Sequence, residues 1–87
     1  MSVERKVVVG SKSGLHARPA SILVKEAARF QSQVELVTAE KAVSLKSLIS
    51  VLALGLKQGA EVTVRATGPD ADEAAAAVAG LLAQDLG

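Results

Sequence analysis

Residues 61–82 read EVTVRATGPDADEAAAAVAGLL, and this stretch decides the fold because it places a strand directly before a helix. Hydrophobic and polar side chains alternate from Glu61 to Thr67, with Val62, Val64 and Ala66 on one side. Such alternation is typical of a strand with one buried and one solvent-exposed face, as in antiparallel sheets. The sequence therefore predicts an antiparallel sheet that is covered on one face.

A helix is predicted to follow this strand at once. Gly68 and Pro69 form a turn, and Asp70 with Glu73 three residues later makes a capping box, in which each side chain bonds a backbone amide at the helix start. The buried stripe of this helix comprises Ala74, Val78, Leu81 and Leu82. We expect the helix to continue to the C-terminus.

The rest of the chain supplies three more strands and two more helices. Val7, Val8 and Val9 predict a strand that ends at Gly10, before a polar loop at residues 11–14. Helical spacing of apolar residues predicts a helix over 19–30. Alternation over 33–38 and a short run at 42–44 predict a hairpin. A short helix is expected within 47–56.

This order of elements, strand, helix, strand, strand, helix, strand, helix, predicts an α+β fold. We expect an open-faced sandwich in which a four-stranded antiparallel sheet carries three helices on one face. A chain of 87 residues is large enough to fold alone around one core, so we expect a single domain over residues 1–87.

Composition excludes several classes of protein. The chain has no cysteine and one histidine, which removes disulfides, thiol catalysis and multi-histidine metal sites. A net charge of +1 and a single aromatic residue, Phe30, argue against nucleic acid as a partner. No apolar run is long enough to span a membrane, and the N-terminus lacks the features of a signal peptide. We expect a cytoplasmic monomer without a metal or cofactor.

Residues 14–20, GLHARPA, hold the most informative candidate site. Gly14 allows the loop to turn, and Pro19 suits the first turn of a helix. His16 would lie at the helix N-terminus, where backbone amides and the helix dipole favour anions, with Arg18 close by. An imidazole is nucleophilic near neutral pH, so these residues predict a phosphorylatable histidine.

A lone histidine in a small protein is more often an ordinary surface residue, and that alternative stays open at this point. An enzyme would need a second catalytic group near His16, and no triad or paired-carboxylate site is evident. A small regulatory module that binds a metabolite or a protein would also fit the composition, with no chemistry at His16. Covalent phosphoryl carriage requires only an exposed imidazole and donors for the phosphate oxygens.

The segment 47–56 is too hydrophobic for a helix with one buried face. Its apolar residues point to every side of a short helix, so some of them should be exposed. They are covered by neighbouring helices or they form a partner-binding patch. Ser47 is the expected N-cap, and a phosphate there would also be tolerated at the helix N-terminus.

These two segments resemble those of the HPr family, the histidine-containing phosphocarriers of the bacterial phosphoenolpyruvate:sugar phosphotransferase system. Residues 14–20 are similar to the active-site signature of the family. Residues 45–48 (LKSL), 54–56 (LGL) and 58–59 (QG) resemble its second signature. Length and element order agree over residues 3–86.

The resemblance implies that His16 accepts a phosphoryl group on Nδ1 from phosphorylated enzyme I and passes it to enzyme IIA domains of sugar permeases. Arg18 would help to hold the phosphate, as would the backbone amides of Ala17 and Arg18. The resemblance further implies a partner surface, which comprises Leu48, Ile49 and Leu52. It implies no cofactor and no catalysis beyond this relay.

In many relatives the serine at the position of Ser47 is phosphorylated by an HPr kinase/phosphorylase, which slows transfer and creates a co-repressor for a catabolite regulator. Ile49 stands where methionine or phenylalanine is frequent in the family. His16 excludes the regulatory paralogue that lacks the histidine. The nitrogen-related branch of the carrier system remains an alternative.

Overall fold

Four strands and three helices make up the fold, and the computed structural model describes residues 1–86. The strands are β1 (Ser2–Val8), β2 (Gln33–Val37), β3 (Ala42–Ser44) and β4 (Glu61–Thr67). The helices are α1 (Ala17–Ala27), α2 (Leu48–Ala53) and α3 (Ala71–Leu82). The predicted order of elements is confirmed.

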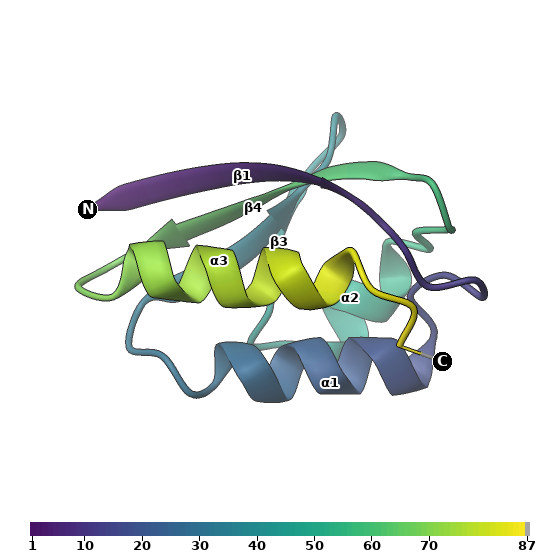
Figure 1. Ribbon diagram of the computed structural model, residues 1–87, viewed down its shortest axis with the longest axis horizontal. Helices are drawn as coiled ribbons and strands as arrows, with labels where there is room; N and C mark the ends of the chain where they lie inside the picture. The colour runs from purple at the N-terminus through teal and green to yellow at the C-terminus, as the bar shows by residue number, and fades with distance from the viewer. Residues whose placement is uncertain (87) are drawn as a thin grey trace.

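The sheet is antiparallel throughout, with strand order β1-β4-β2-β3. β4 lies between β1 and β2, so that Thr67 is opposite Ser2 on one side and Gln33 on the other. Figure 1 shows the helices on one face of this sheet, with α1 and α3 running in opposite directions. The α+β open-faced sandwich is therefore confirmed.

The core lies between the sheet and the helices. Val62, Val64 and Ala66 of β4 are buried, as their alternation predicts. α3 packs on β1 and β4, and α1 packs against both α3 and α2. Leu23 of α1 is fully buried, and so is Val78 of α3. The buried residues of the strands and those of the helices thus pack together in one core.

The bounds of β1, α1 and α3 differ from those predicted, and β2 ends one residue early, at Val37. The first strand begins at Ser2 and ends at Val8, so Val9 lies beyond it, buried and bonded through its amide to the carbonyl of Ala60 (2.9 Å). α1 begins two residues earlier than expected and ends at Ala27. α3 ends at Leu82, because the following residues turn back towards the loop after β1.

The predicted capping box at Asp70 is wrong in its mechanism. Asp70 is the N-cap residue of α3, but its carboxylate makes no capping hydrogen bond. It instead accepts from the backbone amides of Gln31 (3.0 Å) and Ser32 (2.8 Å) and from the Ser32 hydroxyl. The hydrogen bond from the Ser32 hydroxyl, followed by that from Gln31, lowers the pKa of Asp70 below its usual value. Asp70 therefore ties the start of α3 to the start of β2.

We predict that Asp70→Asn destabilises the fold at neutral pH. The side chain of asparagine is neutral and has one accepting oxygen, so it cannot replace the charged carboxylate as the acceptor of all three hydrogen bonds. The pKa of Asp70 is lower in the folded state than in the unfolded state. Its contribution to the free energy of unfolding is therefore fully present above the unfolded pKa and is lost as pH falls through the folded pKa. Urea unfolding followed by circular dichroism at several pH values measures both effects. Asp72→Asn, in the exposed first turn of α3, is the matched control. Equal midpoints for the two variants at neutral pH would contradict the assignment.

Candidate functional site

His16 is the N-cap residue of α1, at the helix N-terminus as its sequence context predicts. Its backbone is extended (φ −84°, ψ −170°), and its carbonyl oxygen accepts the first helical hydrogen bond, from the amide of Ala20 (3.0 Å). The imidazole does not cap the helix, and the residue is exposed. An exposed histidine therefore lies at the electropositive end of α1.

The first two amides of α1 are the donors that an anion at His16 would meet. Ala17 and Arg18 are exposed, and amides at these positions have no partner within a helix. Pro19 occupies the third helical position, is buried and has no N–H to satisfy. The first turn of α1 contains no acidic residue. The structure thus places Ala17 and Arg18 next to His16 in an electropositive setting.

A close backbone contact fixes the loop that leads to His16. Gly14 has a positive φ of 76°, and a Cβ there would lie 2.5 Å from the Leu56 carbonyl oxygen and 3.1 Å from the Lys57 Cα. The amide of the next residue, Leu15, donates to that same carbonyl (2.9 Å). Glycine is required at position 14 for both reasons, conformation and space. The loop before α1 is therefore anchored to the segment after α2.

The end of the chain supports the same loop from another side. Gly10 donates to the Leu82 carbonyl (3.0 Å), and a Cβ on Gly10 would overlap the Ala83 carbonyl oxygen. The buried Ser11 hydroxyl accepts from the Leu86 amide (3.1 Å), and the Lys12 amide donates to the Asp85 carboxylate (3.2 Å). No sequence signal points to this support, because the partners are more than seventy residues apart.

An open cavity of about 360 Å³ adjoins His16. Residues within two segments, 13–17 and 52–57, line it, and they include His16, Ala17, Leu52 and Lys57. The structure thus brings Leu52 of the expected partner surface to the same cavity as His16. Lys57 was missed from the sequence, although it directly precedes the Gln58-Gly59 motif. Arg18 is not among the residues that line this cavity.

α2 carries the other predicted site residues. Ser47 is its N-cap, and the hydroxyl accepts from the amide of Ser50 (3.2 Å), so the predicted cap is confirmed. Ile49 is 81% exposed and Leu48 is 36% exposed, while Leu52 is half-buried. The expectation that part of this hydrophobic helix faces solvent is correct. Ser47, Leu48 and Ile49 lie outside the cavity beside His16.

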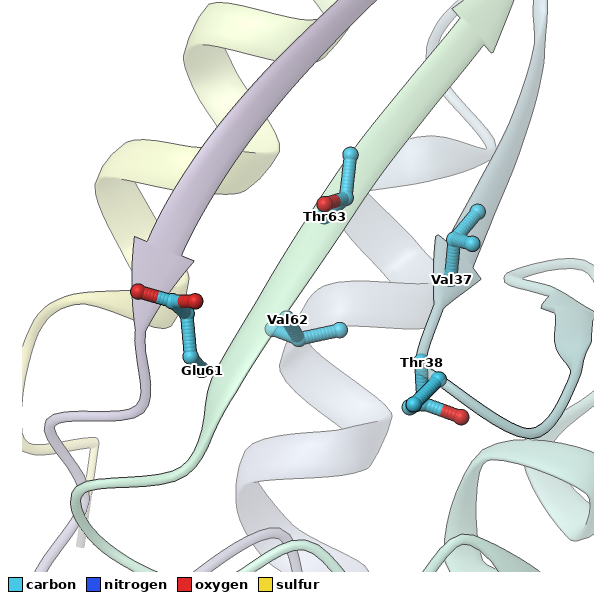
Figure 2. Close-up of a pocket in the computed structure, with 6 residues that line it drawn as sticks. Val37, Thr38, Glu61, Val62 and Thr63 are labelled. Atoms are coloured by element: carbon cyan, nitrogen blue, oxygen red, sulfur yellow. The ribbon is translucent and has the colours of Figure 1, made fainter.

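A second cavity, of about 320 Å³, lies between the ends of β2 and β4. Figure 2 shows that Glu61 turns its carboxylate towards the end of β1 and away from Val37 and Thr38. Glu61 is the one ionisable residue among those that line this cavity. The described residues that line this cavity therefore bring no cluster of charged groups together in it.

Within residues 1–86, no cluster of acidic, histidine or cysteine side chains has the composition to hold a metal ion. In the same part of the chain, no helix is both long and apolar enough to cross a membrane.

Comparison with known proteins shows the family. Residues 3–84 match the PTS-HPr family model, which is described as the PTS HPr component phosphorylation site. The chain is 46% identical over 71 residues to the phosphocarrier protein HPr of Mycoplasma capricolum, and the match covers 82% of this chain and 80% of that protein. It is 49% identical over 71 residues to HPr of Lysinibacillus sphaericus, with 82% and 81% covered.

The fold agrees with these sequence matches. The crystal structure of HPr from Bacillus anthracis superposes with a TM-score of 0.89 at 36% identity, covering 93% of this chain and 96% of that one. The sequence and the fold are together those of a small phosphocarrier protein. This chain belongs to the HPr family of the phosphotransferase system.

We predict that Gly14→Ala destabilises the protein more than Gly55→Ala does. Gly55 also has a positive φ (60°) but has open space around its Cβ position, so its substitution costs about 1–2 kcal/mol through conformation alone. At position 14 the displaced Leu56 backbone adds about 1–3 kcal/mol. Urea unfolding of both variants measures the difference, and equal losses would show that the contact at Gly14 is easily relieved.

Proposed function

We propose that this protein accepts a phosphoryl group on His16 from phosphorylated enzyme I and passes it to enzyme IIA domains of sugar permeases. In the first transfer, Nδ1 of His16 attacks phosphorus while the bond from phosphorus to the donor atom of enzyme I breaks. In the second, a nucleophilic atom of the enzyme IIA domain attacks phosphorus while the bond from phosphorus to Nδ1 of His16 breaks. The observation that carries the proposal is the exposed imidazole at the N-terminus of α1 in a chain of the HPr family. Arg18 and the amides of Ala17 and Arg18 supply the hydrogen bonds to the phosphate oxygens.

The strength of these interactions suits a carrier. Each favourable charge interaction at an exposed helix N-terminus is worth about 0.3–1 kcal/mol. The group at His16 is therefore stabilised only modestly, and the same phosphate can be released to an acceptor. A deep pocket would hold the group too tightly to be passed on.

The exposed part of α2 is the proposed docking surface for the partners. Leu48, Ile49 and Leu52 form it, and Leu52 joins it to the cavity beside His16. One continuous apolar surface next to the transfer point would serve donor and acceptors in turn, because each must bring its own reactive group to His16.

Ser47 is the proposed regulatory position. Its hydroxyl lies at the start of α2, directly before Leu48 and Ile49. A phosphate added by an HPr kinase/phosphorylase would be compatible with the helix N-terminus and would place negative charge beside the docking surface. Transfer from enzyme I would then slow, and the modified surface would be available to a catabolite regulator.

The first prediction of this function is an acid-labile phosphoryl adduct. Incubation with enzyme I and phosphoenolpyruvate should add one phosphoryl group to the wild-type protein, because a phosphorus–nitrogen bond to imidazole forms at His16. Mass spectrometry before and after acid treatment measures it. His16→Ala should give no adduct. A wild-type protein that stays unmodified, or an adduct that persists in His16→Ala, would overturn the proposal.

The docking surface and Ser47 can be tested in one transfer assay. Ile49→Ala should slow phosphorylation by enzyme I about 5-fold or more, while its free energy of unfolding stays within about 0.5 kcal/mol of wild type. Phosphorylation by HPr kinase and ATP should slow the same transfer, and Ser47→Ala should escape that modification.

Val8→Ala is the matched control, because Val8 is 51% exposed on β1, outside the cavity beside His16. If Val8→Ala and Ile49→Ala slow transfer equally, α2 is not the docking surface. Equal labelling of wild type and Ser47→Ala by the kinase would remove Ser47 from the site.

A further inference from the structure

The cavity beside His16 contains one permanently charged side chain among the residues that line it, and that residue is Lys57. Lys57 follows α2 in the chain and is exposed. His16 and Ala17, from the start of α1, also line this cavity. A lysine and the candidate nucleophile therefore line one open cavity.

The backbone of Lys57 has a fixed position relative to His16. Its Cα packs against Gly14, and the preceding Leu56 carbonyl accepts from the Leu15 amide (2.9 Å). On the other side, the Lys57 carbonyl accepts from the Ala60 amide (3.0 Å). The next residue, Gln58, donates from its side chain to the Gly10 carbonyl (3.4 Å). The base of the lysine side chain is thus held at the loop that carries His16, while its flexible four-carbon stem extends into solvent.

The local charge favours an anion in this space. The first turns of α1 and α2 contain no acidic residue. Asp85, the acid that contacts the loop before His16, accepts from the Lys12 amide. Among residues 1–86, no Asp or Glu is one of those that line the cavity. A phosphoryl group on His16 carries negative charge on its oxygens, and Lys57 is the lysine among the described residues that line the cavity with His16.

We propose that Lys57 is a second phosphate-binding cation of the site, which contacts the phosphoryl oxygens during transfer to His16 and in the phosphorylated protein. The proposal rests on the function proposed for His16 and adds a residue to it. Arg18 lies on α1 itself, whereas Lys57 reaches the phosphate from the segment after α2. Because Arg18 and Lys57 belong to separate segments, the contact between Gly14 and residues 56–57 determines whether the positive charge of Lys57 is available at His16.

A small phosphoryl donor tests this role without a protein partner. With phosphoramidate, an imidazole nitrogen of His16 bonds to phosphorus, the phosphorus–nitrogen bond of the donor breaks, and ammonia leaves with the electron pair of that bond. The ring keeps the proton on its other nitrogen at the moment of transfer. No docking surface takes part, so a change in rate reports the groups that surround His16.

Lys57→Gln should slow the modification of His16 by phosphoramidate about 3-fold to 10-fold at low ionic strength. The difference should shrink in about 1 M salt, where charges are screened within about 3 Å. Lys57→Arg should restore most of the rate. Lys41→Gln, in the exposed turn between β2 and β3, is the control of equal charge change. Mass spectrometry gives the rates, and urea unfolding confirms that each variant is folded.

The outcomes separate the two proposals. A wild-type protein that phosphoramidate does not modify at His16 would overturn the proposed function itself. Modification of wild type and Lys57→Gln at the same rate would overturn the role of Lys57 alone. A third outcome is that the rate difference between wild type and Lys57→Gln persists in high salt and that Lys57→Arg is as slow as Lys57→Gln. Lys57 would then act only by holding the loop, which also overturns its role as a phosphate-binding cation.

Discussion

The close approach of the backbone at Gly14 to the backbone at Leu56 and Lys57 is the constraint on which the site depends. It is possible only because residue 14 has no Cβ and can adopt a positive φ. Through this contact the loop before α1 takes its direction from the segment after α2. The position of His16 is consequently set by a part of the chain about forty residues further on.

An exposed site can be well defined when its supports are buried. Leu15 is 4% exposed and Ser11 is 1% exposed, while His16, Ala17 and Arg18, which follow them in the chain, are exposed. The backbone of the loop is bonded to the end of the chain on one side and to residues 56–60 on the other. Such an arrangement holds the backbone of residue 16 in one place while its side chain remains exposed.

The sequence predicts those features that depend on near neighbours. β3 and β4 have their predicted bounds, and Ser47 caps α2, because alternation and capping act over a few residues. The Asp70 capping box is wrong because its competing partner, Ser32, is 38 residues away. Lys57 could not be found for the same reason, since contacts between residues about forty positions apart bring it to the loop that carries His16. The roles of the site residues remain predictions.

The strand order has a consequence for folding during synthesis on the ribosome. β1 is made before the other strands of the sheet, but its neighbour is β4, which follows β2 and β3 in the chain. Until residues 61–67 have left the exit tunnel, β1 has no partner strand and β2 lacks the neighbour on its inner side. Closing so long a loop is slow compared with forming the β2–β3 hairpin. The nascent chain therefore completes its sheet only after β4 has emerged, and the loop that carries His16 takes its final shape no earlier than the segments that support it.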